Sequence, residues 1–278
     1  MISKSSTFIN QYGPWALIAG ASEGLGEAFA EELAKKGLNL VLIARREKLL
    51  QKISKNIQKK YRVEVIVLPL DLNSSDMLEV IESRTKDLDV GLFVYNAALS
   101  PIGLFTNHSL ETHLKVINLN CIGSMTLTYH FCSKMKEKSR GGIILMSSMA
   151  GLQGSPIHAH YGATRAYTRH LAESLWLEMK DFNVHVTACV AGATATPNYL
   201  SSEPIDKDLI KPKPMKPERV VDFALKGLVK NKPRVIPGFA NKISVRFLHS
   251  FLSSKERIKL MGSVAQKMYG ENKNHINK

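Results

Sequence analysis

Short apolar runs alternate along the chain with longer segments in which apolar residues recur at helical spacing. Six apolar runs predict buried strands at residues 16–19, 39–44, 64–68, 92–95, 143–147 and 184–190, and a weaker one is expected at 234–236. Several runs are apolar at successive positions, which is typical of strands covered on both faces. The alternation of strand and helix predicts βαβ units and a mainly parallel sheet.

Apolar residues four positions apart predict the intervening helices. Leu25, Phe29 and Leu33 form one buried stripe, and Gly37 is expected to end that helix. The same pattern predicts a second helix over 47–60, and a long third helix is expected over 110–135. The second helix would bury its apolar stripe, which consists of Leu49, Leu50, Ile53 and Ile57.

The last third of the chain changes in character. Four prolines and many charges fall within residues 199–217, so this segment is expected to be irregular and is a candidate lid over a site. Residues 241–278 then predict a basic helical extension. The four prolines are Pro204, Pro212, Pro214 and Pro217.

The composition supports one globular domain over residues 1–278. Of the 278 residues 44% are hydrophobic and 22% are charged, which provides a sizeable core and excludes a wholly disordered chain. Three cysteines lack metal-ligand spacing and lie among apolar neighbours, so they are interpreted as reduced core residues and no metal is expected. These cysteines are Cys121, Cys132 and Cys189.

The net charge of +14 is concentrated near the C-terminus. Residues 1–199 carry 21 basic and 17 acidic side chains, whereas residues 200–278 carry 17 and 7. Without a recognition motif this excess is interpreted as a solvated surface, and no nucleic-acid partner is expected. Phe247, Leu248, Phe251 and Leu252 recur there at helical spacing among basic residues. Such a helix would cap the sheet or form a dimer contact, or it would lie on a membrane surface.

The chain shows no apolar run long enough to span a bilayer, and its first residues are polar. Together with the reduced cysteines, these features favour a cytoplasmic location.

A glycine-rich turn follows the first predicted strand and opens the first helix. It contains Gly20, Gly24 and Gly26, with Ser22 and Leu25 between them. Glycines at such a turn permit close backbone approach, and the helix N-terminus offers free N–H groups to an anion. In this strand–turn–helix context the motif predicts a dinucleotide-binding, doubly wound α/β domain, the Rossmann fold.

The end of the second strand indicates which dinucleotide is bound. An acidic residue there would receive the ribose 2′-hydroxyl of NAD, whereas a basic one would receive the 2′-phosphate of NADP. Arg45 and Arg46 occupy this place, so NADP is favoured over NAD. Alternatively, both arginines are solvated, with Glu47 as a partner.

With these motifs, residues 14–240 resemble the short-chain dehydrogenase/reductase family. The resemblance assigns Asp71 and Leu72 to adenine contact, and it matches Asn96 and Ala97 to part of the family's Asn-Asn-Ala-Gly signature. Tyr95 and Ala98 depart from that signature.

The family's catalytic residues are sought by position. Tyr161 matches the tyrosine, and Ser148 lies at the family's spacing, 13 residues before it. Ser147 is adjacent, but neighbouring side chains on a strand point to opposite faces. Asn118 and Asn120 both compete for the asparagine position, and Asn120 fits the pattern better.

Where the family has a lysine, four residues after Tyr161, this chain has Arg165. An ordinary tyrosine hydroxyl has a pKa of about 10, and acid–base catalysis works best near the operating pH. A cation four residues away on a helix lies on the same face and favours the phenolate. Arginine supplies that charge but does not release a proton, and its planar fork differs from an ammonium group.

After the sixth strand, the resemblance assigns Gly192, Thr194 and Thr196 to the nicotinamide region, while Ala191 replaces the family's proline. His158 and His160 precede Tyr161 and are interpreted as surface or core residues rather than catalytic ones.

The resemblance implies an NADP-dependent oxidoreductase that transfers hydride between nicotinamide and a carbonyl or secondary alcohol. By analogy the substrate is a lipophilic ketone, and the protein is a homo-oligomer built on its long helices. The alternative is a catalytically impaired dinucleotide-binding sensor or scaffold, because Arg165, Ala98 and Ala191 depart from the family pattern.

Overall fold

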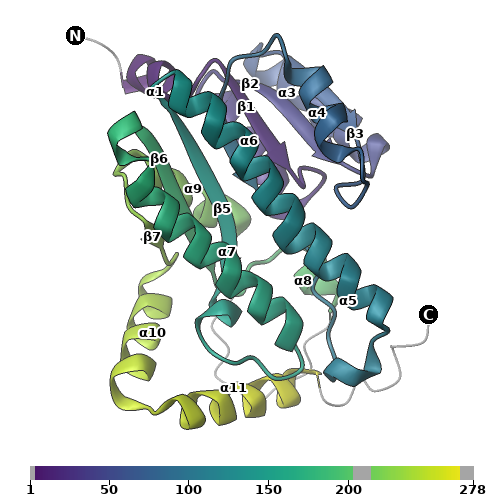
Figure 1. Cartoon of the computed structure of the whole chain (residues 1–278), viewed down its shortest axis with the longest axis vertical. Coiled ribbons are helices and arrows are strands. Elements are labelled where there is room, and N and C mark those ends of the chain that lie inside the picture. Colours follow the sequence, from purple (N-terminus) through teal and green to yellow (C-terminus); the bar gives the residue numbers. More distant parts are fainter. Residues whose placement is uncertain (1–3, 203–213, 270–278) are drawn as a thin grey trace.

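The computed structural model describes residues 4–202 and 214–269, and its centre is one seven-stranded parallel sheet (Figure 1). The strand order is β3-β2-β1-β4-β5-β6-β7, which is a doubly wound arrangement with β1 and β4 at the centre of the reversal. The strands are β1 (Trp15–Ala19), β2 (Asn39–Ala44), β3 (Val65–Pro69), β4 (Val90–Tyr95), β5 (Gly141–Ser148), β6 (Val184–Ala191) and β7 (Arg234–Val235). All seven predicted strands and the Rossmann fold are confirmed.

Helices cover both faces of the sheet. One layer contains α2 (Gly24–Lys35), α3 (Glu47–Tyr61) and α9 (Pro217–Val229), and the other contains α4 (Met77–Thr85), α6 (Ser124–Glu137) and α7 (Ala159–Glu178). Alternate residues of each strand enter the two cores. Ala16 and Ile18 join the α2 side, while Leu17 and Ala19 join the α6 side.

The first two helices agree with the sequence pattern. Within α2, Phe29 and Leu33 are fully buried, and Gly37 follows the helix with a φ of +88°. Because glycine adopts positive φ without a steric cost, it suits the turn that leads from this helix into β2. The predicted stripe of α3 is likewise buried at Leu50, Ile53 and Ile57.

The predicted long helix over 110–135 has a different form. It comprises α5 (Leu110–Ile117), a π-helical turn η2 (Asn118–Gly123) and then α6. A π-turn inserts a residue into the helical repeat, which the apolar pattern alone does not show. The insertion lies at the two candidate asparagines.

An additional helix, α1 (Lys4–Tyr12), precedes the sheet and was not expected. Phe8 and Tyr12 are buried, and the Tyr12 hydroxyl hydrogen-bonds His185 Nδ1 at 2.7 Å. The spacing of these two aromatic residues was the available signal, but a nine-residue polar helix depends on tertiary packing for its stability.

The remaining elements are short or C-terminal. Within residues 199–217, the structure contains the end of α8 (Pro197–Ser201) and residues 214–217, while 203–213 lie outside the described residues. Two helices, α10 (Phe239–Phe251) and α11 (Ser254–Tyr269), form the C-terminal region. The short helical turns are η1 (Phe105–Asn107), η3 (Met149–Leu152) and η4 (Lys180–Phe182). No helix in the described ranges is both long and apolar enough to cross a bilayer.

Candidate active site

The candidate site lies at the carboxyl ends of β1, β4, β5 and β6, which meet at one edge of the parallel sheet. In open α/β sheets ligands bind at this edge, where the strand order reverses. Most of the sequence-predicted residues lie on loops that leave these strands or on the helices that follow them.

The glycine turn after β1 is tightly packed against the loop after β4. Gly20 has a φ of +85°, and a Cβ there would lie 2.6 Å from the Ala97 nitrogen. A Cβ on Gly26 would overlap the Gly20 carbonyl oxygen. These glycines therefore leave a backbone-lined cradle at the start of α2 that side chains would fill, as a pyrophosphate requires.

Asn96 fixes the same turn from the β4 side. Its Nδ2 donates to the Gly20 carbonyl oxygen at 2.8 Å, and the backbone nitrogens of Asn96 and Ala97 both donate to the Ala19 carbonyl oxygen. The two residues that match the Asn-Asn-Ala-Gly signature thus hold the cradle in shape.

Arg46 lies over the glycine turn. Its guanidinium donates to Ser22 Oγ at 2.8 Å and to Glu23 Oε2 at 2.9 Å. Glu47 was a possible partner under the alternative of solvated arginines. Both arginines are exposed, but Arg46 pairs with Glu23 because the loop after β2 directs it toward the turn after β1. The hydrogen bond to Glu23 raises the pKa of Arg46. Arg45 is exposed beside it.

Asp71 and Leu72 follow β3. Asp71 is exposed, and its Oδ1 accepts a hydrogen bond from the Asn73 nitrogen at 3.0 Å, whereas Leu72 is buried in the core on the α6 side. They lie at the same edge of the sheet as the glycine turn because the strands are parallel.

The two serines at the end of β5 point in different directions. Ser147 is buried and donates to the Arg165 carbonyl oxygen at 2.8 Å, whereas Ser148 is half-buried. Ser148 Oγ accepts a hydrogen bond from the Ala150 nitrogen at 3.2 Å. Because side chains alternate along the strand, Ser147 points toward α7 and packs against it, whereas Ser148 does not. Ser148 lies at the carboxyl end of β5.

Asn120 lies in the π-turn and is fully buried, whereas Asn118 is exposed. The Asn120 side chain pairs with the backbone of Leu99, since Oδ1 accepts from the nitrogen and Nδ2 donates to the carbonyl oxygen, each at 2.9 Å. Nδ2 also donates to Thr164 Oγ1 at 3.0 Å. Asn120 thus ties the loop after β4 to α7.

Tyr95, at the end of β4, contacts the π-turn η2 that carries Asn120. Its hydroxyl is buried and donates to the Leu119 carbonyl oxygen, and a Cβ on Gly123 would lie 2.9 Å from that hydroxyl. Burial raises the pKa of Tyr95, so the hydroxyl stays protonated and acts as a donor. The departure from the signature at this position has a structural role.

Tyr161 and Arg165 lie one turn apart on α7. The guanidinium carbon of Arg165 is 5.0 Å from the centroid of the Tyr161 ring, within the range of a cation–π interaction. The Arg165 side chain is only 2% exposed, and its Nη1 donates to the Met146 carbonyl oxygen at 2.7 Å. Among the described residues, its Nε and Nη2 have no hydrogen-bond partner. Two buried donors of Arg165 therefore lack a partner among the described residues.

The loop after β6 reaches back to the glycine turn. Thr196 caps α8 through a hydrogen bond from the Tyr199 nitrogen to its Oγ1, and a Cβ on Gly24 would lie 2.9 Å from the Thr196 methyl group. Thr194 is buried and donates to the Gly192 carbonyl oxygen at 3.0 Å. Of the three predicted residues of this loop, Thr196 lies beside the cradle, whereas a Cβ on Gly192 would lie 2.8 Å from Asn241 Nδ2.

The histidines before Tyr161 form aromatic contacts. The His158 ring lies 6.4 Å from Tyr161 and 5.2 Å from Tyr269 of α11, measured between centroids, and burial lowers its pKa. His160 Nδ1 is 3.0 Å from His113 Nδ1, and burial together with His113 lowers the pKa of His160. Both imidazoles are neutral near pH 7.

Comparison with known proteins identifies the family. The family model for short chain dehydrogenases matches residues 14–204, which include the glycine turn, Asn120, Ser148 and Tyr161. The chain belongs to the short-chain dehydrogenase family.

Individual relatives of this short-chain dehydrogenase include hydroxysteroid dehydrogenases. A 7β-hydroxysteroid dehydrogenase of Mediterraneibacter gnavus is 34% identical over 262 residues, covering 94% of this chain and 99% of its own length. A solved 7β-hydroxysteroid dehydrogenase structure superposes with a TM-score of 0.86 at 33% identity, covering 92% of this chain and 99% of that one.

Two further relatives bear on the cofactor and on activity. A solved short-chain dehydrogenase from Sphingobium yanoikuyae, in complex with NADPH, is 28% identical, with a TM-score of 0.75 and coverage of 87% of this chain and 97% of that one. A human protein, inactive hydroxysteroid dehydrogenase-like protein 1, is 32% identical over 70% of this chain and 60% of its own length.

This short-chain dehydrogenase is therefore an NAD(P)-dependent oxidoreductase that acts on a small-molecule substrate, with hydride transfer between nicotinamide and a carbonyl or secondary alcohol. The sequence missed several residues that shape its site. Thr164 and Tyr95 hold the π-turn, and Glu23 pairs with Arg46. Only Tyr95 gave a signal, as a departure from the family signature.

Proposed function

We propose that this short-chain dehydrogenase is an NADP-dependent oxidoreductase acting on a lipophilic ketone or the corresponding secondary alcohol. The observation that carries the proposal is a chain of two hydrogen bonds, from Asn120 to Thr164 and from Thr164 to the backbone of Tyr161 on α7. The Tyr161 ring in turn lies near the Arg165 guanidinium. Thr164 Oγ1 donates to the Tyr161 carbonyl oxygen at 2.8 Å, so the asparagine and the tyrosine are held in one unit.

The proposed roles follow from chemistry. When bound, the nicotinamide supplies or accepts the hydride. In reduction Tyr161 donates a proton to the substrate oxygen, and Ser148 hydrogen-bonds that same oxygen. Asn120 is proposed to help order water through the π-turn that it stabilises, because its own side chain is bonded to Leu99 and Thr164.

Arg165 is proposed to stand where the family has its lysine. Its guanidinium carbon lies 5.0 Å from the Tyr161 ring centroid, and its two unpartnered donors, Nε and Nη2, are proposed to bind the hydroxyls of the nicotinamide ribose. Because the guanidinium does not release a proton, the proton that re-forms the Tyr161 hydroxyl must come from water rather than from this side chain.

NADP is proposed as the preferred cofactor. β2 ends without a carboxylate, and Arg45 and Arg46 follow it, so a 2′-phosphate would meet two guanidinium groups and Ser22 Oγ. Glu23 holds Arg46 in the free protein and would have to yield to the phosphate. The NADPH-bound relative from Sphingobium yanoikuyae supports this preference.

The remaining cofactor contacts are proposed from the geometry of the cradle. The backbone of the glycine turn would face the pyrophosphate, the residues after β3 and β4 the adenosine, and the loop after β6 the nicotinamide. The proposed set is Gly20, Ser22, Gly24, Leu25, Gly26, Arg45, Arg46, Asp71, Leu72, Asn96, Ala97, Tyr161, Arg165, Gly192, Thr194 and Thr196.

The lipophilic substrate is proposed from the hydroxysteroid dehydrogenases that this chain resembles. The segment 199–217 is proposed as its lid, because α8 begins at Thr196 beside the cradle and Met215 pairs with Thr194 through a parallel bridge. Cytoplasmic location is proposed from the three free, buried cysteines, which are typical of a reducing compartment.

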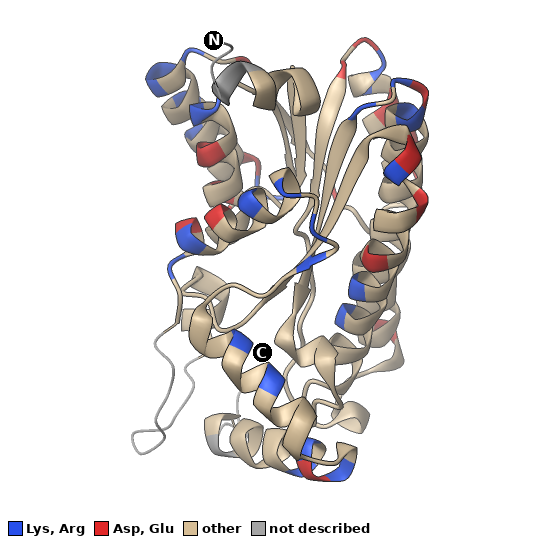
Figure 2. Cartoon of the chain, turned by 90° about the vertical axis from the view of Figure 1, so that its left-hand side faces the viewer, with Lys and Arg blue, Asp and Glu red and all other residues tan. Residues whose placement is uncertain are grey.

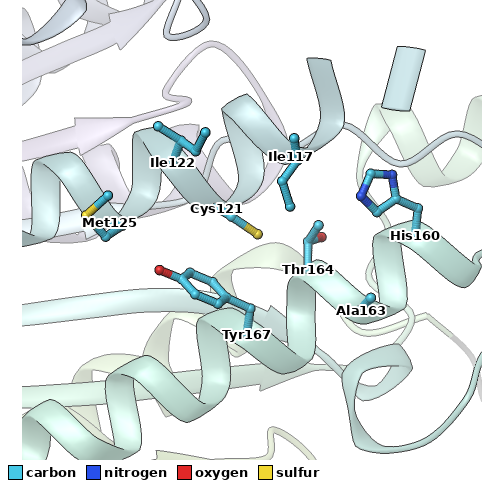
Figure 3. A pocket seen from close by; sticks show the side chains of 8 residues that line it. All are labelled: Ile117, Cys121, Ile122, Met125, His160, Ala163, Thr164 and Tyr167. Atoms are coloured by element: carbon cyan, nitrogen blue, oxygen red, sulfur yellow. The ribbon is translucent and has the colours of Figure 1, made fainter. Parts of the chain in front are cut away.

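A homo-oligomer is proposed through the outer face of α5, α6 and α7. A mainly apolar groove of about 320 Å³ lies between these helices, lined among others by Ile122, Met125 and Tyr167 (Figure 3). These three side chains are 49%, 42% and 41% exposed, and the pairing of this face with a second copy would bury them. A concentration-dependent mass that Met125→Glu reduces to the monomer would support this contact.

A second candidate is a dinucleotide-binding sensor with little turnover. The observation in its favour is that Arg165 already donates Nη1 to the Met146 carbonyl oxygen, which holds the guanidinium against β5. The human relative named inactive shows that this fold also occurs in proteins without activity.

Cofactor titration followed by a substrate panel tests the proposal. Purified protein is titrated with NADPH and NADH by fluorescence, with Arg45→Ala and Arg46→Ala beside the wild type. We expect tighter binding of NADPH, lost mainly in the two variants, and reduction of bulky ketones by the wild type. Failure to bind either nucleotide would overturn the enzyme assignment, and NADPH binding without turnover of any ketone would favour the sensor.

A further inference from the structure

The C-terminal helix α10 has an apolar stripe that no other part of the described chain covers. Phe239, Ile243, Phe247 and Phe251 follow each other at intervals of four residues and are 79%, 51%, 55% and 72% exposed. None of the 13 residues of α10 is buried. A cap on the sheet, the first of the earlier interpretations of this region, is therefore wrong for this face of α10.

The stripe is continuous along α10. The rings of Phe247 and Phe251 lie 4.9 Å apart, and beside the stripe the Lys242 Nζ lies 5.6 Å from the ring centroid of Phe223 on α9. Three exposed phenylalanines on one short helix exceed the scattered apolar residues of an ordinary surface. A partner that removes these rings from water would therefore gain free energy from their burial.

The charges around the stripe are almost all positive. Residues 239–269 contain six basic residues and one acidic one. Lys242 and Arg246 are exposed on α10 itself, and Figure 2 shows Lys and Arg along both C-terminal helices. The one acidic residue, Glu256, accepts hydrogen bonds from the nitrogen and hydroxyl of Ser253 at 2.7 Å and thereby caps α11.

This charge pattern distinguishes between possible partners. A two-fold contact between the α10 helices of two copies would bring Lys242 and Arg246 of both copies close together. The helix carries no carboxylate that could compensate this positive charge. An anionic surface is complementary instead. A helix with aromatic side chains on one face and basic residues beside them is typical of helices that lie in the interface of a bilayer.

We propose that α10 is a peripheral membrane-binding element, with its phenylalanine stripe inserted among the headgroups of an anionic phospholipid bilayer. Lys242 and Arg246 would contact lipid phosphates, and the basic residues of α11 would add longer-range attraction. The proposal does not depend on the assigned cofactor or substrate.

Insertion of α10 into a bilayer would also affect the position of the active site. α11 packs on the loop before α7, where a Cβ on Gly154 would lie 3.0 Å from Ile258, and its Tyr269 contacts His158. In Figure 1, α10 and α11 lie at the lower end of the molecule, and α11 runs below the amino-terminal end of α7. Membrane contact through α10 would hold this end of the site near the bilayer.

Vesicle sedimentation of the full chain tests the proposal. The probes are vesicles of phosphatidylcholine alone and of phosphatidylcholine mixed with phosphatidylserine, at low salt and at about 1 M salt, where the Debye length falls to about 3 Å. We expect binding to the phosphatidylserine vesicles at low salt and loss of that binding at high salt. No binding, or equal binding to neutral vesicles at both salt concentrations, would overturn the proposal.

Two variants of α10 and a matched control sharpen the test. Phe247→Ser with Phe251→Ser, and Lys242→Glu with Arg246→Glu, should each weaken binding by about tenfold or more. The control, Lys55→Glu with Lys59→Glu, makes the same charge change at the same spacing on exposed positions of α3 and should have a smaller effect. NADPH affinity and the unfolding temperature report whether each variant is intact. If the phenylalanine variant instead dissociates an oligomer while the wild type ignores vesicles, the stripe is a protein interface.

Discussion

The guanidinium of Arg165 lies 5.0 Å from the ring centroid of Tyr161 and is almost entirely buried, with one of its nitrogens bound to the Met146 carbonyl oxygen. A positive charge thus lies beside the Tyr161 ring. Among the ion pairs of the described residues, none involves Arg165. This charge is the basis of the role proposed for Arg165 in proton transfer at Tyr161.

Arg165→Met should reduce kcat for ketone reduction by about 100-fold or more, because it removes the guanidinium charge that lies 5.0 Å from the Tyr161 ring centroid. Arg165→Lys should cause a smaller fall, since lysine keeps the charge but loses the guanidinium fork that donates to the Met146 carbonyl oxygen. Steady-state reduction at saturating NADPH and ketone measures both kcat values. A rise of kcat in Arg165→Lys by orders of magnitude would instead indicate an impaired natural site.

The two adjacent serines provide a matched pair of variants. Ser148→Ala should lower kcat by about 100-fold, because it removes the hydroxyl proposed to bind the substrate oxygen, and should leave the free energy of unfolding nearly unchanged. Ser147→Ala should instead lower the free energy of unfolding by about 0.5–1.5 kcal/mol, because it removes a buried hydrogen bond to the Arg165 carbonyl oxygen. Steady-state kinetics and urea denaturation separate the two effects. The reverse pattern would show that Ser147 faces the substrate.

Tyr95→Phe should destabilise the π-turn that carries Asn120. The variant keeps the ring but removes the buried donor to the Leu119 carbonyl oxygen, which should lower the free energy of unfolding by about 1–3 kcal/mol. Because Asn120 is held in the same turn, kcat should fall while the affinity for NADPH stays unchanged. Thermal unfolding and kinetics at saturating NADPH measure these quantities. Unchanged stability would mean that the Leu119 carbonyl oxygen finds another donor.

Acidification should destabilise the protein partly through His158. Burial lowers the pKa of His158 in the folded state below its ordinary value of 6.5, so the unfolded state binds its proton first. The stability that this neutral imidazole contributes is full above about pH 6.5 and is lost as the pH falls below that value. His158→Asn should therefore show a smaller decrease of the unfolding temperature between pH 7.5 and pH 5.5, about two units spanning the ordinary histidine pKa. An identical pH dependence in both proteins would contradict this role.

The strands, the first helices and the glycine turn were predictable because their signals are local. An apolar run such as Leu40–Ile43 in β2 has one favourable environment, a sheet covered on both faces, whatever its neighbours are. The cradle needs glycine at Gly20 and Gly26 for steric reasons that hold in any such turn. The four-residue separation of Tyr161 and Arg165 likewise fixes their common helix face.

The direction of individual side chains depended on contacts between distant segments. Asn120 is buried and Asn118 exposed because a π-turn aligns one of them with Leu99 and Thr164, and Arg46 pairs with Glu23 because two loops 23 residues apart meet. The aromatic pair of α1 is buried only where the sheet is present.

The sequence by itself therefore determined the doubly wound fold, the dinucleotide cradle and the presence of an arginine beside the tyrosine, since each follows from local patterning and spacing. Only the tertiary structure decided which polar side chains enter the site and that the phenylalanine stripe of α10 remains exposed. The physical reason is that burial and hydrogen bonding of a single side chain are set by the partners that folding brings to it, and those partners lie far away along the chain.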